Sequence, residues 1–157
     1  GHDIRVKTKP EVDYNRFWMT SLEMRWVVFS VQAEGEVRII LSNETYNVNG
    51  ADNHYEIVLG ANNNTRSFIQ GFVSTEEPRP ILVEVGTSPL RGSNVPHTFW
   101  ARWDFGVIEV GSGPVVGVEP IMRYFETENP KKIESISAIG FTTSNGYEGH
   151  WRISNFG

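Results

Sequence analysis

HTFWARWDFGVIEV, residues 97–110, carries the clearest structural pattern in this chain. Apolar and polar side chains alternate along both halves of the stretch, and a period of two residues is typical of a β-strand whose two faces differ. Between the halves, Asp104-Phe105-Gly106 supplies a glycine, which adopts positive φ without steric cost. The stretch therefore predicts a β-hairpin with strands over His97–Trp103 and Val107–Val110.

The same alternation recurs in short runs along the rest of the chain. The runs predicted as strands are Met24–Gln32, Glu36–Ser42, His54–Leu59, Thr65–Val73, Ile81–Val85, Pro120–Phe125, Ile133–Thr142 and Glu148–Ser154, and residues 13–18 could add an edge strand. Turn residues separate the runs, with Asn62-Asn63-Asn64 and the type I′ signal Ser144-Asn145-Gly146 among them. No segment has a convincing helical period. About ten strands at this spacing predict an all-β fold, an antiparallel β-sandwich or jelly roll.

Size and composition indicate one globular domain. The chain has 157 residues, of which 39% are hydrophobic and 21% charged. Gly1-His2 is interpreted as an expression scar, which leaves residues 3–157 as a single domain. A net charge of −5 argues against a nucleic-acid partner, and no apolar run approaches the roughly 20 residues of a membrane span. The absence of cysteine excludes thiol catalysis and disulfides.

The tryptophans divide between two expected roles. Trp100 and Trp103 point to opposite faces of one regular strand, so they cannot both enter the same layer of core. Trp100 and Trp151 are predicted to be core residues. Trp103 is predicted to form part of a sugar platform, since an aromatic ring beside polar groups packs on the apolar C–H face of a sugar.

Polar groups in the loops complete the predicted ligand site. Amides, hydroxyls and carboxylates supply both donors and acceptors for sugar hydroxyls. The predicted ligand contacts are Asp52, Asn53, Asn64, Arg102, Trp103, Asp104, Asn145 and Tyr147.

No catalytic residue, metal ligand or cofactor is predicted. The three histidines outside the scar are far apart and lack the spacing of a metal site. Gly111-Ser112-Gly113 has no helix pattern after it and is interpreted as a turn, not a nucleotide loop. A glycosidase pair drawn from Glu56, Asp104, Glu109 and Glu148 stays open as an alternative. Two N-glycosylation sequons, at Asn43 and Asn63, are compatible with an extracellular protein.

Three stretches, in their order and spacing, resemble motifs of one known family. They are Tyr55-Glu56-Ile57-Val58-Leu59-Gly60 with Asn64 and Ser67 after it, Phe99-Trp100-Ala101-Arg102-Trp103 with Val107-Ile108-Glu109-Val110-Gly111, and Ile139-Gly140-Phe141 with Gly149-His150-Trp151-Arg152-Ile153. Together they resemble the farnesoic acid O-methyltransferase-like domain, an all-β domain of arthropod and complement-like extracellular proteins. Where that family often has Asp-Ala-His-Ile, this chain has Glu36-Val37-Arg38-Ile39.

The resemblance and the residues lead to three hypotheses. The first is a non-enzymatic recognition module of an extracellular protein that binds carbohydrate or a protein partner. The second, implied by the family name, is an S-adenosylmethionine-dependent farnesoic acid O-methyltransferase, although the all-β pattern lacks the strand, Gly-rich turn and helix of the common cofactor site. The third is a structural or adhesive domain that self-associates into a homo-oligomer.

Overall fold

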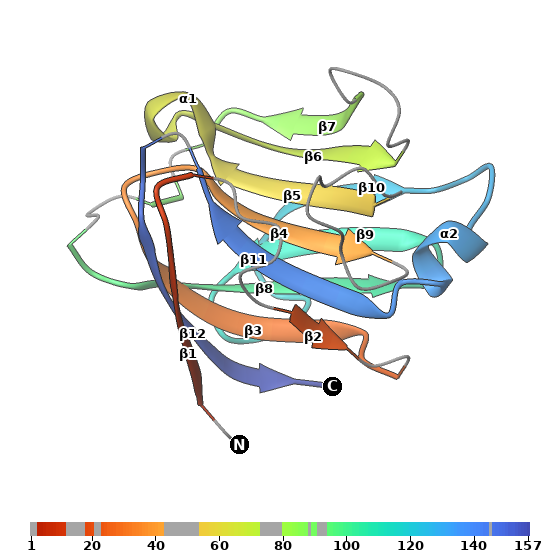
Figure 1. Cartoon of the computed structure of the whole chain (residues 1–157). Coiled ribbons are helices and arrows are strands. Elements are labelled where there is room, and N and C mark those ends of the chain that lie inside the picture. Colours follow the sequence, from red (N-terminus) through yellow and green to blue (C-terminus); the bar gives the residue numbers. More distant parts are fainter. Residues whose placement is uncertain are drawn as a thin grey trace.

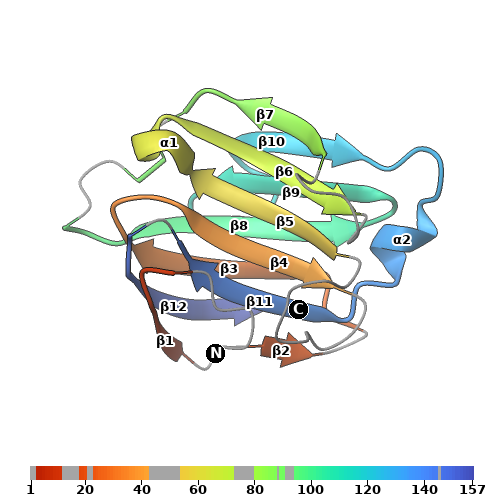
Figure 2. The same cartoon turned by 45° about the horizontal axis from the view of Figure 1, so that its top comes forward.

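The computed structural model describes residues 3–11, 18–20, 23–42, 54–72, 80–87, 89–90, 94–144 and 146–157. In these residues the chain forms two six-stranded sheets, packed face to face, in which every neighbouring pair is antiparallel (Figure 1). The all-β sandwich expected from the alternating pattern is confirmed. Figure 2 shows the sheet that contains β4 (Val37–Ser42) and β5 (His54–Gly60) in front of the sheet that contains β8 (His97–Asp104) and β9 (Val107–Ser112).

Strands from both ends of the chain build each sheet. Sheet A has the order β1 (Ile4–Thr8), β12 (Gly149–Phe156), β3 (Trp26–Gln32), β8 (His97–Asp104), β9 (Val107–Ser112) and β10 (Pro120–Phe125). Sheet B has the order β2 (Trp18–Thr20), β11 (Ala138–Thr143), β4 (Val37–Ser42), β5 (His54–Gly60), β6 (Arg66–Phe72) and β7 (Ile81–Val85). The described residues also form two single turns of helix, α1 (Ala61–Asn64) and α2 (Lys131–Glu134).

The core lies between the inward faces of the two sheets. Phe29 of β3 and Trp151 of β12 are almost wholly buried and meet Phe141 of β11 across the sandwich. The ring centroids of Trp151 and Phe141 are 5.2 Å apart and those of Trp151 and Phe29 5.6 Å. The indole N–H of Trp151 donates to the Thr8 hydroxyl at 2.8 Å, so the ring is buried without an unsatisfied donor. The prediction that Trp151 is a core residue is confirmed.

Trp100 and Trp103 take opposite faces of β8, as their spacing predicts. Trp103 lies in the core between the sheets. Trp100 is also fully buried, but on the outer face of sheet A, where its ring lies over Gly111 of the neighbouring strand. Its indole N–H donates to the carbonyl of Val118 at 2.7 Å. The loop after β9 therefore covers a tryptophan that the alternation along β8 turns away from the core.

Three local features differ from the sequence expectation or refine it. Ile133 lies in α2, and the strand expected from that residue begins at Ala138. α1 is a left-handed turn, in which Asn62 and Asn63 have φ of 52° and 60°; asparagine tolerates this region better than most residues. In the β8–β9 hairpin both turn residues have positive φ, 49° at Phe105 and 75° at Gly106.

Candidate functional site

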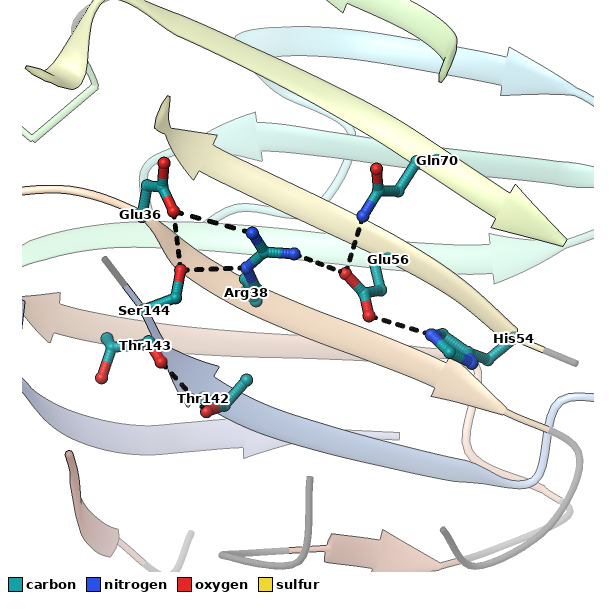
Figure 3. Close-up of polar contacts among 8 residues, drawn as sticks. All are labelled: Glu36, Arg38, His54, Glu56, Gln70, Thr142, Thr143 and Ser144. Atoms are coloured by element: carbon teal, nitrogen blue, oxygen red, sulfur yellow. Dashed lines mark hydrogen bonds and ion pairs between the residues drawn. The ribbon is translucent and has the colours of Figure 1, made fainter. Parts of the chain in front are cut away.

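A polar network lies on the outer face of sheet B, where β4, β5 and β6 are adjacent. Alternation along each strand sends Ile39 and Ile57 into the core and turns Arg38, Glu56 and Gln70 to the opposite face. The register places Gln70 directly opposite Glu56 and places Arg38 two residues away from the partner of Glu56. Side chains from three strands therefore meet at one place on the sheet (Figure 3).

Glu56 is the centre of this network. Its side chain is fully buried, and its carboxylate accepts a hydrogen bond from Arg38 Nη1 at 2.8 Å and another from Gln70 Nε2 at 2.9 Å. The second carboxylate oxygen lies 2.9 Å from Nε2 of His54, which is also fully buried. Three groups of different chemistry thus hold one carboxylate, which is how proteins compensate a buried charge.

Arg38 connects this buried centre to the edge of the sheet. Its Nε donates to Ser144 Oγ at 3.0 Å, and its Nη2 lies 3.6 Å from Glu36 Oε2. Ser144 Oγ in turn donates to the same Glu36 oxygen at 2.7 Å. The side chains of Arg38 and Glu36 remain 18% and 13% exposed, whereas that of Glu56 is not exposed at all. The network therefore begins in a dry environment and reaches solvent at Arg38 and Glu36.

Packing alone does not explain this network. Burying a carboxylate and its partners carries a desolvation cost of several kcal/mol, and well-packed apolar side chains would often be as stable. A fixed array of guanidinium, carboxylate, amide and hydroxyl groups provides closely spaced donors and acceptors, which is the chemistry that recognises hydroxyl-rich ligands. Among the described residues, no group of three metal-ligating side chains occurs.

The predicted ligand contacts that the structure describes lie in different parts of the sandwich. Asn64 and Tyr147 lie at the end of the sandwich near Gly35, where the Asn64 side-chain oxygen accepts a bond from the Leu90 backbone N–H at 3.1 Å. Tyr147 packs beside Gly35, and its hydroxyl donates to Asn63 at 3.2 Å. The Asn64 side chain and the Tyr147 hydroxyl therefore both make bonds within the chain. Asp52, Asn53 and Asn145, with the sequon residue Asn43, lie outside the described residues.

Arg102 and Asp104 lie at the opposite end of the sandwich, on the outer face of sheet A. They line a cavity of about 350 Å³ together with Phe105, Arg123 and Phe125. Arg102 Nη2 lies 2.6 Å from a carboxylate oxygen of Glu109, and Arg123 binds the other oxygen of the same carboxylate. This second arginine–glutamate cluster faces away from the network on sheet B.

The prediction that Trp103 forms part of a sugar platform is wrong. Its side chain is 1% exposed and packs between the sheets, so its ring offers no face to a ligand. The alternation along β8 left the choice between Trp100 and Trp103 open, because both sides of that strand are covered. A strand buried on both faces gives no sequence signal of which face is the core.

Most of the network was not predicted from the sequence. From the sequence, Glu56 is a possible glycosidase carboxylate and part of a family motif, but not a predicted ligand contact. The structure places it on the opposite sheet from Glu109. One feature of the sequence could have indicated the network: Glu36 and Arg38 occupy the positions of the aspartate and the histidine in the family's Asp-Ala-His-Ile motif. The structure shows that this acid–base pair belongs to the network.

The comparisons with known proteins agree with this class of fold. The described residues form an all-β sandwich with a polar network on the outer face of one sheet. Residues 8–156 match the family described as farnesoic acid O-methyltransferase, and the chain belongs to that family. A search of curated proteins finds no match. Neither helical element in the described part of the chain is long and apolar enough to cross a membrane.

Several solved structures share the fold at low sequence identity. A carbohydrate-binding module (CBM66) from Bacillus subtilis aligns with a TM-score of 0.51 and 8% identity, over 89% of this chain and 75% of that one. A galectin from Caenorhabditis elegans aligns with a TM-score of 0.54 and 10% identity, over 98% and 96% of the two chains. A laminarinase from Flavobacterium aligns with a TM-score of 0.52 and 8% identity, over 98% and 68%. At such identities these likenesses establish the fold alone.

Proposed function

We propose that this chain is a carbohydrate-binding module whose ligand lies on the outer face of sheet B and contacts Glu36, Arg38 and Gln70. One observation carries the proposal: Arg38 is fixed between two carboxylates and a serine hydroxyl, at the point where a buried network reaches solvent. Two proteins of this fold carry carbohydrate-binding or galectin names, which is consistent with the proposal but does not carry it.

The chemistry of the network suits sugar hydroxyls. Each hydroxyl both donates and accepts a hydrogen bond, so a neighbouring guanidinium and carboxylate can satisfy it in both directions. Glu56 and Ser144 hold the arginine in place, and His54 in turn fixes the Glu56 carboxylate. Less side-chain entropy is therefore lost when the ligand binds. The network serves recognition in this proposal, without a catalytic step.

The test is isothermal titration calorimetry of the purified chain against a panel of neutral oligosaccharides. Arg38→Lys keeps a cation beside Glu56 but loses the planar, multidentate guanidinium, so it should fold and bind about tenfold more weakly. The matched control is Arg123→Lys, which makes the same change beside the buried carboxylate of Glu109 on the other sheet. Equal affinities of the Arg38→Lys variant and the original chain would refute the assignment of this site.

The same titration tests the activity in the family name. S-adenosylmethionine and farnesoic acid are added as separate ligands, because methyl transfer requires that both bind. Saturable binding of the two, with no oligosaccharide bound, would replace the recognition module with the enzyme.

We also propose an extracellular location for this module. Asn63 of the second sequon is exposed on the α1 turn, where an oligosaccharyltransferase could reach it. Expression through a secretory pathway followed by mass spectrometry should find a glycan on Asn63, and its loss in Asn63→Gln is the control. A fully secreted chain without glycan on Asn63 would remove this support.

A further inference from the structure

A second cavity, separate from the network, lies on the outer face of sheet A beside the edge strand. Its volume is about 470 Å³, and the described residues that line it come from β1, β12 and β3 together with Pro96. Arg5, Lys7 and Arg152 bring three positive charges to it, and His150 adds another when protonated. None of the described lining residues is acidic. This concentration of positive charge contrasts with the net charge of −5 of the whole chain.

The register between β1 and β12 sets like charges opposite each other. Arg5 is the direct cross-strand partner of Arg152, and Lys7 is the partner of His150. Like charges in such positions are unfavourable, because the side chains on one face of an antiparallel pair stand close together. Two such pairs in succession indicate that the arrangement has a use other than stability.

The nearby acids neutralise this charge only in part. Asp3 accepts a bond from Arg152 at 2.7 Å, and Glu148 lies 3.8 Å from Lys7 and 3.4 Å from His150. Both acids are well exposed, and exposed pairs of this kind are weak. Among the described residues, Arg5 has no ion-pair partner.

Protection of a sheet edge is a simpler explanation, but it covers only half of the cluster. Charged side chains on an edge strand discourage edge-to-edge association, which accounts for Arg5 and Lys7 on β1. It does not account for Arg152 and His150, which lie on β12, an interior strand of the sheet. Nor does it explain a hollow between these residues.

Hydroxyl and amide groups from β3 lie alongside the cations. Ser30 and Gln32 line the cavity, and the Ser30 hydroxyl is 2.9 Å from that of Thr98. Arginine binds carboxylate and sulfate groups with two parallel hydrogen bonds, and the neutral groups suit the hydroxyls around such an anion. We propose that this cavity binds an acidic carbohydrate through its carboxylate or sulfate group, with Arg5 and Arg152 as the anion contacts. This inference rests on the proposed carbohydrate binding but uses different residues.

The experiment compares three polymers with one backbone: dextran, carboxymethyl-dextran and dextran sulfate. Arg5→Gln is the test variant, because it removes one charge without breaking any ion pair among the described residues. Lys131→Gln is the matched control, since it removes the same charge from an exposed residue of α2 on the far side of the molecule (Figure 1). The original chain should bind one or both acidic polymers and not dextran. Arg5→Gln should weaken that binding about tenfold, and Lys131→Gln should change it less than twofold.

A thermal melt accompanies each titration. Arg5→Gln should melt no lower than the original chain, because it relieves the repulsion of Arg152, and this separates lost binding from lost folding. Three outcomes overturn the inference: no preference for the acidic polymers, an equal loss in both variants, or binding to phosphatidylserine vesicles but not to acidic dextrans. Neutral oligosaccharides that bind through Arg38 while acidic dextrans do not bind would remove this inference alone. Failure of every carbohydrate would remove the proposed function as well.

Discussion

Replacing Arg38 with alanine tests whether water is excluded from the buried carboxylate of Glu56. Glu56 is fully buried and holds three partners at 2.8–2.9 Å, so removing the guanidinium leaves an under-compensated charge. Breaking a buried pair from one side costs about 3–5 kcal/mol, and the remaining His54 and Gln70 favour the lower end. For a chain of this size, about 3 kcal/mol corresponds to a fall in Tm of about 6–12 °C.

A double-mutant cycle identifies the cause of that loss. Neutralising the carboxylate in the same chain, as Arg38→Ala with Glu56→Gln, removes the uncompensated charge and should recover at least about 1 kcal/mol of the free energy of unfolding. Urea denaturation of the two single variants and the double variant gives the coupling energy. With a slope of about 2 kcal/mol per molar urea, Arg38→Ala should shift the midpoint by about 1.5 M. A loss below about 1 kcal/mol, or a double variant no more stable than Arg38→Ala, would show that water reaches Glu56 and that the reasoning is wrong.

Three further predictions concern the framework of the fold. Phe105→Asn should raise the Tm by a few degrees. The Phe105 side chain is bulky and 88% exposed, its backbone is strained at a φ of 49°, and asparagine tolerates that region better. An unchanged or lower Tm would argue that Phe105 makes a stabilising contact in the folded chain. Gly111→Ala should destabilise the fold by about 1–3 kcal/mol in urea denaturation, because the Cβ of the new alanine would lie 2.2 Å from the buried ring of Trp100. A neutral effect would mean that this ring can move aside. Burial first, and then the hydrogen bond to Glu126, raise the pKa of Tyr124 above its usual value near 10. Because the unfolded tyrosine ionises at a lower pH than the folded one, stability should decline as the pH rises above 10, and Tyr124→Phe should decline less steeply in alkaline denaturation; parallel slopes contradict the assignment.

The sequence predicted the fold class because both sheets follow a period-two pattern that is visible without a structure. The strands predicted from Met24 onward correspond to β3–β12 of the structure, with ends that differ by a few residues. β1 was not predicted, since its alternating Arg5 and Lys7 lie on an exposed edge and Val6 is its one buried aliphatic residue. Of the possible edge strand at residues 13–18, residues 13–17 lie outside the described residues, and Trp18 is the first residue of β2. The Asn62-Asn63-Asn64 turn was predicted correctly because asparagine is suited to positive φ.

The candidate sites were less accessible to sequence reasoning. Loop amides and Trp103 were expected to bind a ligand, yet Trp103 belongs to the core and the Asn64 side chain accepts a hydrogen bond from the backbone of Leu90. The network instead uses outward residues of three strands, and a buried Glu56 has the same place in the alternation as an exposed glutamate. Only the partners across β4, β5 and β6 distinguish the two.

The sequence by itself therefore determined the local structure: strands, turns, family membership and the sharing of Trp100 and Trp103 between opposite faces. Tertiary structure alone decided which outward charges meet. Arg38 and Glu56 are 18 positions apart in the chain, Arg38 and Ser144 are 106 apart, and Arg5 is opposite Arg152. The physical reason is that alternation fixes the face on which a side chain lies, whereas strand order and register fix its neighbours, and these depend on the packing of the whole sandwich.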